Sequence, residues 1–132
     1  MTDYYHAIVW IDHHEARVFH FGVDEADKVS VHPRNPVQHI HHKANEIGSG
    51  HAPEDQAFFH AVVQALGGAA AILLTGPANA KNELEKHIER HDPQLKARIK
   101  GIETLDHPSD GVLLAHARKY FKAEDGMGAQ RR

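Results

Sequence analysis

Apolar runs separated by short polar turns divide the first third of the chain into extended segments. Residues 7–11 are apolar at every position, which is typical of a strand covered on both faces. A polar turn at 12–15 separates this run from a second one at 17–21, so the pair predicts a β-hairpin. A third strand is expected at 28–32, where valines alternate with polar residues. The run 37–42 follows two prolines and is interpreted as an edge strand, where proline is tolerated.

Helical periodicity begins at Pro53 and alternates with two further apolar runs. The first helix is expected to end at Gly67, and the run 69–75 predicts a buried parallel strand. The inner face of the following helix is predicted to comprise Ala80, Leu84, Ile88 and His91. A last strand is expected at 101–105, and Ser109 is expected to cap a final helix. The apolar stripe of that helix is predicted to comprise Val112, Leu113, His116, Ala117 and Tyr120.

The order of these elements predicts an α/β architecture. Three strands in an antiparallel meander are followed by helix, strand, helix, strand and helix, which requires right-handed crossovers. One arrangement accommodates both the meander and the right-handed crossovers. It is a ribonuclease H-like mixed five-stranded sheet of order 3-2-1-4-5, with helices on both faces. We expect a single domain over residues 1–122 and a disordered tail over 123–132.

Composition narrows the possible environments and partners. The 132 residues contain no cysteine, which excludes disulfides and thiolate metal sites. Because no apolar run approaches the roughly 20 residues of a membrane span, we expect no membrane partner and a cytoplasmic location. Lys and Arg number 15 against 18 Asp and Glu, so the chain lacks the basic excess of a protein that coats nucleic acid. Any RNA contact is therefore expected to be local.

Histidine is abundant, with 14 in the chain, and one group of them suggests metal binding. His39 and His41 would project from the same face of the predicted edge strand, and His51 follows in the next loop. Neutral imidazoles at these positions suit zinc or nickel, with His39, His41 and His51 as ligands. A solvated histidine-rich edge explains the same pattern without a metal.

Two further features have both a functional and a structural interpretation. The turn from Thr75 to Lys81 joins a strand to a helix N-terminus, where Asn79 and Lys81 could contact phosphate, although it also suits an ordinary tight turn. Asp12 and Asp106 follow strands at the carboxyl edge of the sheet, as metal ligands do in nucleases of this fold. Turn formation and helix capping explain the same two carboxylates.

Three segments, in this order and spacing, resemble one known family. They are Ile-Val-Trp-Ile-Asp-His-His-Glu-Ala-Arg-Val-Phe-His-Phe at 8–21, Ile-Leu-Leu-Thr-Gly-Pro-Ala-Asn-Ala-Lys-Asn-Glu-Leu at 72–84, and the segment 95–105. The family is the central domain of eukaryotic and archaeal peptide-chain release factors and of the ribosome-rescue protein Pelota, and small bacterial translational machinery proteins are also similar. Release factors carry Gly-Gly-Gln in the loop that corresponds to 46–56. Because Gln56 is not preceded by two glycines, the resemblance does not extend to peptidyl-tRNA hydrolysis.

The resemblance implies a non-enzymatic, translation-associated module that binds the ribosome or structured RNA. The expected RNA contacts are His41, His42, Lys43, His51, Asn79 and Lys81. One alternative is a divalent-metal protein, with a metal-dependent hydrolase or nuclease as its enzymatic form. Another is a homo-oligomeric interaction domain that pairs through the edge strand at 37–42.

Overall fold

The computed structural model describes residues 5–33 and 53–130 of the chain, with side chains described at 5–33 and 55–123. In chain order, its elements are β1 (His6–Ile11), β2 (Ala16–Phe21), β3 (Ala26–Val31), α2 (Pro53–Leu66), β4 (Ala71–Gly76), α3 (Ala80–His91), α4 (Pro93–Lys96), β5 (Ile99–Thr104) and α5 (Asp110–Gln130). The predicted edge strand at 37–42 lies outside the described residues and stays a prediction.

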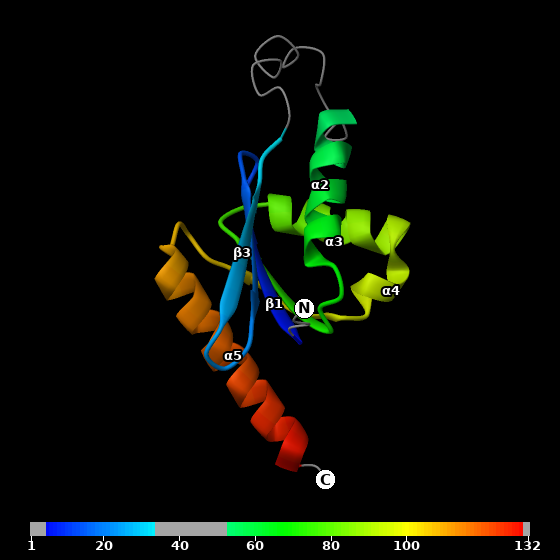
Figure 1. Cartoon of the computed structure of the whole chain (residues 1–132). Helices are drawn as coiled ribbons and strands as arrows, with labels where there is room; N and C mark the ends of the chain where they lie inside the picture. The colour runs from blue at the N-terminus through cyan, green and yellow to red at the C-terminus, as the bar shows by residue number, and fades with distance from the viewer. Residues whose placement is uncertain (1–4, 34–52, 131–132) are drawn as a thin grey trace.

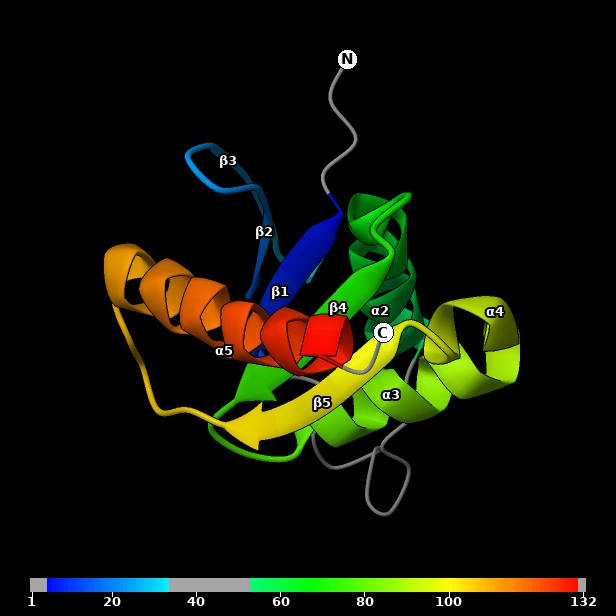
Figure 2. The ribbon, with the colours of Figure 1, turned by 90° about the horizontal axis from the view of Figure 1, so that it is seen from below.

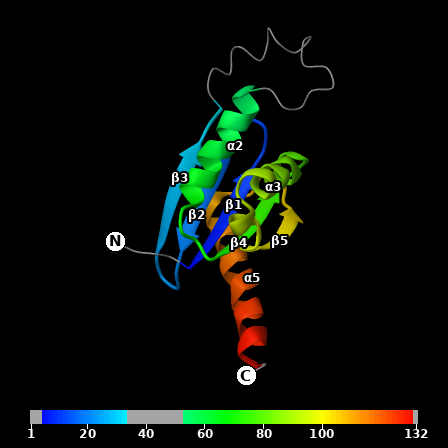
Figure 3. The same ribbon diagram turned by 90° about the vertical axis from the view of Figure 1, so that its right-hand side faces the viewer.

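Within the described residues, the strands form one five-stranded mixed sheet in the order β3-β2-β1-β4-β5. β1 pairs antiparallel with β2 and parallel with β4, and it therefore lies in the centre of the sheet. The strands follow one another in this order across Figure 3. The predicted ribonuclease H-like arrangement, with its hairpin next to two parallel crossovers, is confirmed.

Helices cover both faces of the sheet, as predicted. The pair α2 and α3 packs on one face, where Val9, Phe59 and Leu84 belong to one buried cluster. Helix α5 packs on the opposite face with Trp10 and Phe121 in a second cluster. Figures 1 and 2 show the sheet between these two layers. Because β1 alternates its side chains between two covered faces, its sequence is a continuous apolar run.

The ends of the elements follow local chemistry. Gly67 adopts a positive φ of 53° and ends α2, and Ser109 accepts a hydrogen bond from the Val112 backbone N–H at 3.2 Å to cap α5. Gly76 ends β4 against β1, where an added Cβ would lie 2.2 Å from the Ile11 carbonyl oxygen. Only glycine permits this close approach, which sets where the chain leaves the sheet to begin α3.

The predicted stripe of α5 is wrong by a small rotation of the helix. Its fully buried residues are Leu113, Ala117 and Phe121, whereas Val112 is 60% exposed. The Phe121 ring lies 4.5 Å from the His6 ring and 6.0 Å from the Phe21 ring, between centroids. Turning α5 in this way buries a large aromatic ring and exposes a smaller valine, which favours the observed orientation.

Helix α5 continues to Gln130, past the predicted domain end at Lys122. Its C-terminal part extends beyond the sheet in Figure 1. Disorder of 123–132 in solution stays a prediction. Among the described helices, none combines the length and hydropathy needed to cross a membrane.

Candidate nucleic-acid interface

Most of the predicted contact residues lie outside the described part of the chain. They are His39, His41, His42, Lys43 and His51, which comprise the whole predicted metal set and most of the predicted RNA contacts. The chain leaves β3 and enters α2 at the same end of the molecule (Figure 1). A zinc or nickel site at these histidines and oligomerisation through 37–42 therefore stay predictions.

The two remaining predicted contacts, Asn79 and Lys81, lie at the start of α3 but face different surroundings. Asn79 is exposed, and its side-chain amide donates to the Glu83 carboxylate at 3.3 Å and accepts from Asn82 at 3.0 Å. Lys81 is only 6% exposed, and its ammonium donates a hydrogen bond to the backbone carbonyl of Ala78. Asn79 thus lies on an open surface, whereas Lys81 holds the β4–α3 turn.

Asp12 stabilises the β1–β2 turn. Its Oδ1 accepts hydrogen bonds from the backbone N–H groups of His14 at 2.8 Å and Glu15 at 2.9 Å, which is the geometry of an Asx turn. Asp106 has a 94% exposed side chain, and His107 lies between the two carboxylates, 3.6 Å from Asp12 and 3.0 Å from Asp106. Among the side chains described at 5–33 and 55–123, no three metal-type ligands lie close enough to hold an ion.

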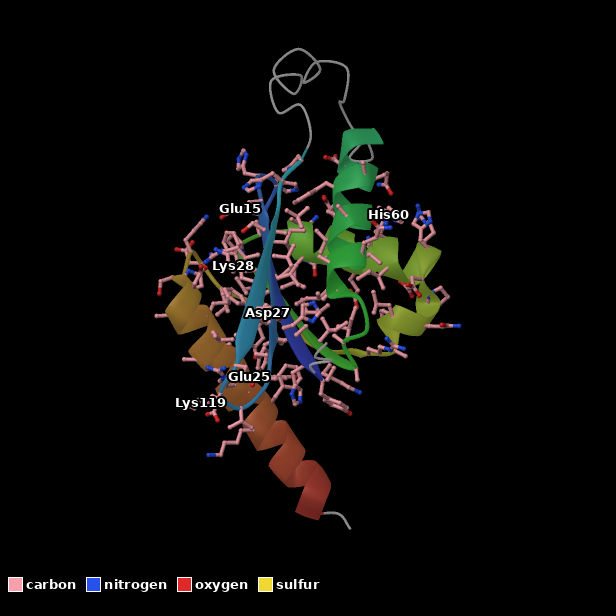
Figure 4. All side chains as sticks on the ribbon, viewed as in Figure 1. Glu15, Glu25, Asp27, Lys28, His60 and Lys119 are labelled. Atoms are coloured by element: carbon pink, nitrogen blue, oxygen red, sulfur yellow. The ribbon has the colours of Figure 1, made fainter. Side chains whose placement is uncertain are left out.

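A groove between α2 and α3 is lined by polar and basic side chains. It consists of two adjoining cavities of about 250 and 490 Å³ that share Gln56, His87 and His91. The remaining lining residues are Phe59, His60, Val63, Asn79, Glu83, Lys86, Ile88, Arg90 and Asp92. His60 projects from α2 on the side where α3 and α4 lie (Figure 4). We refer to this feature as the α2–α3 groove.

His87 is the buried histidine of the α2–α3 groove, so the predicted inward position of His91 is wrong. His87 Nδ1 lies 2.9 Å from Gln56 Oε1, and the His87 ring lies 5.7 Å from the Phe59 ring. His91 is exposed at the end of α3, with its ring 4.4 Å from that of His87. The difference arises because α2 covers the flank of α3 that carries His87, whereas His91 lies beyond the packed part of the helix.

Burial and neighbouring basic side chains both act on His87. Burial lowers the pKa of His87 below its usual 6.5, and the neighbouring His91, His60 and Arg90 lower it further. Lys86 and Arg90 are both exposed, and among the described side chains neither of theirs forms an ion pair or side-chain hydrogen bond. The lining of the α2–α3 groove thus carries two cations, Lys86 and Arg90, and two carboxylates, Glu83 and Asp92.

Sequence reasoning placed His91 on the inner face of its helix, and it missed the α2–α3 groove. One signal was present: Lys86 and Arg90 repeat at a spacing of four residues, and so do His87 and His91, which places both pairs on adjacent rows of one helix. The contribution of Gln56 could not be read from the sequence, because it depends on how α2 packs on α3.

On the opposite face of the sheet, the buried Arg17 pairs with the partly exposed Asp110. Arg17 donates to the Asp110 carboxylate at 2.8 Å and to the Pro108 carbonyl at 2.9 Å, and its guanidinium lies 4.5 Å from the centre of the Trp10 ring. Lys28 donates to the other Asp110 oxygen at 2.7 Å. Hydrogen bonds from Lys28 and Arg17 hold the pKa of Asp110 below its usual value. We call these four residues, with Pro108, the α5 junction.

The fold is similar to that of three solved structures. The chain aligns with Pelota from Thermoplasma acidophilum at 17% identity and a TM-score of 0.55, over 82% of this chain and 30% of that one. Pelota from Archaeoglobus fulgidus aligns at 12% identity and a TM-score of 0.57, over 96% and 37% of the two chains. The archaeal translation termination factor aRF1 aligns at 12% identity and a TM-score of 0.52, over 96% and 39%.

These similarities concern the fold alone, and the chain spans well under half the length of each of the three proteins. Comparisons with protein-family models and with curated protein sequences gave no significant match. The fold predicted from the resemblance is confirmed, because Pelota and aRF1 share the arrangement of this chain.

Proposed function

We propose that this chain is a non-enzymatic, translation-associated module that binds the ribosome or structured RNA. The observation that carries the proposal is the fold, which aligns over 96% of the chain with proteins named as Pelota and as a translation termination factor. In this proposal the chain corresponds to the central domain of those proteins. The absence of Gly-Gly before Gln56 in the sequence supports a binding role over peptidyl-tRNA hydrolysis.

The position of Gln56 also supports a binding role. Its side-chain oxygen lies 2.9 Å from His87 Nδ1, so Gln56 connects α2 to α3. A glutamine that orients water for hydrolysis must instead reach a substrate. The proposed contacts comprise His41, His42, Lys43 and His51, together with Asn79 at the start of α3. Lys81, which the sequence also predicts as a contact, is instead buried in the β4–α3 turn.

Sedimentation of the full chain with purified ribosomes tests the proposal. Phosphate contacts weaken as salt rises, so we expect the chain in the ribosome pellet at about 50 mM salt and progressive loss of binding toward about 200 mM. A chain that stays in the supernatant at the lower salt concentration would contradict the proposal.

A matched pair of variants locates the contact. The triple variant His41→Ala, His42→Ala, Lys43→Ala should sediment less than the wild type at every salt concentration. The control variant, Lys100→Gln with Lys119→Gln, removes two exposed charges from β5 and α5 and should sediment as the wild type does. Equal loss in both variants would indicate a nonspecific charge effect.

A further inference from the structure

Helix α3 presents two adjacent rows of basic side chains to the α2–α3 groove. Lys86 and Arg90 form one row, and His87 and His91 form the other. Members of a row are one turn apart, with about 6 Å between their Cβ atoms. Four nitrogen-bearing side chains therefore line one side of a cavity of about 250 Å³.

The carboxylates that line the α2–α3 groove already have partners. Glu83 lies 3.3 Å from His13 Nε2 through one oxygen and accepts from Asn79 at 3.3 Å through the other. Asp92 lies at the far end, where its Oδ1 accepts from the backbone N–H of Leu95 at 3.3 Å and caps α4. Both carboxylates are thus committed to the fold, whereas Lys86 and Arg90 lack partners among the described residues.

The shape of the α2–α3 groove favours a linear ligand over a compact one. Its lining follows α3 from Asn79, just before the helix, to Asp92, just after it. Helix α2 provides the other wall with Gln56, Phe59 and His60. A groove of this length with cations along one wall suits a polyanion lying along α3, and the nucleic-acid backbone is such a ligand.

We propose that the α2–α3 groove is an RNA-backbone site, in which Lys86 and Arg90 bind phosphodiester oxygens and His91 and His87 donate further hydrogen bonds to them. The inference rests on the proposed function, and it names the surface through which the described part of the chain contacts RNA. It adds residues on α3 to those that the sequence predicts at its start.

Binding at this site strengthens in mild acid. Without a ligand His87 is held neutral, because burial, His91, His60 and Arg90 all disfavour its protonated form. A bound phosphate adds negative charge beside His87 and favours its protonated form. The other charged groups that line the groove are Lys86, Arg90, Glu83 and Asp92, two positive and two negative.

Fluorescence anisotropy with the full chain and a labelled single-stranded RNA of about 12 nucleotides tests the proposal. The variant Lys86→Gln with Arg90→Gln should bind at least about tenfold more weakly at low salt, and the slope of log affinity against log salt should fall by about 2. The control Lys100→Gln with Lys119→Gln carries the same charge change and should bind within about twofold of the wild type. Equal losses in the two variants, or no loss in the first, would overturn the proposal.

A second experiment measures how RNA affinity depends on pH and tests the role of the histidines. Wild-type affinity should rise between pH 7.5 and pH 6.0, and His87→Gln with His91→Gln should remove most of that rise. Competition with polyglutamate of matched charge separates phosphodiester recognition from general anion attraction. Displacement of RNA at equal charge concentration would overturn the site as an RNA-backbone site.

The two proposals fail separately. If Lys86→Gln with Arg90→Gln sediments with ribosomes as the wild type does and also binds RNA normally, the groove site is wrong while the ribosome-binding function stands. If the wild type does not sediment with ribosomes but loses RNA affinity through this variant, the groove site stands and ribosome binding is wrong.

Discussion

The two faces of the sheet differ in whether their charged side chains have partners inside the fold. On the α5 face, Arg17 and Lys28 converge on Asp110 and close the layer. On the opposite face, Lys86 and Arg90 border a groove and have no partner among the described residues. Charges that face partners inside the fold contribute to stability, whereas cations beside a cavity remain available to a ligand. The α5 face therefore holds the domain together, and the α2–α3 face is where we expect binding.

The largest effect on the free energy of unfolding should come from a substitution on the buried side of α5. Phe121→Ala removes a buried ring from the cluster that contains Trp10 and should lower the free energy of unfolding by about 3–5 kcal/mol. Val112→Ala lies on the exposed side of the same helix and should change it by less than about 0.5 kcal/mol. Urea denaturation monitored by Trp10 fluorescence measures both. Similar costs for the two variants would contradict the observed orientation of α5.

A smaller effect should come from the α5 junction. Arg17→Ala removes two hydrogen bonds and the contact with Trp10, and should lower the free energy of unfolding by about 2 kcal/mol. Lys28→Ala removes a more exposed partner of the same carboxylate and should cost less than about 1 kcal/mol. Urea denaturation again measures both. If Lys28→Ala costs as much as Arg17→Ala, the junction is not anchored by the buried guanidinium.

The smallest effect should be the pH response of His87. Its folded pKa lies below 6.5, so below about pH 6.5 the unfolded chain binds a proton that the native chain resists. This contribution to stability is present above the unfolded pKa and is lost as pH falls toward the folded pKa. In urea titrations from pH 7.5 down to 5, His87→Gln should destabilise less steeply than the wild type. The control is His14→Gln, at an exposed histidine of the β1–β2 turn. An unchanged slope in His87→Gln would contradict the assignment.

Much of the architecture could be predicted from the local pattern of residues. The continuous apolar run of β1 indicated a central strand, and the polar turn with Asp12 indicated a hairpin. The order of strands and helices then left few right-handed arrangements, of which 3-2-1-4-5 is observed. Periodicity was sufficient here because each element had one dominant way to bury its apolar residues.

The candidate site could be predicted only in part. Asn79 lies where the sequence places it and lines the α2–α3 groove, whereas Lys81 is buried against the β4–α3 turn. The sequence does not show whether the ammonium group of a lysine at a helix start faces solvent or a backbone carbonyl. That choice depends on how the turn folds around Gly76, which the spacing of residues does not encode.

The sequence by itself determined the elements, their order and the sheet, because apolar periodicity and turn residues act locally along the chain. Only the tertiary structure decided that His87 is buried instead of His91, that Phe121 faces the core, and that Asp110 accepts from both Arg17 and Lys28. Each of these outcomes depends on which neighbouring helix or strand covers a side chain. The residues that cover these side chains are tens of positions away in the sequence. Their contacts therefore form only when the helices pack on the sheet.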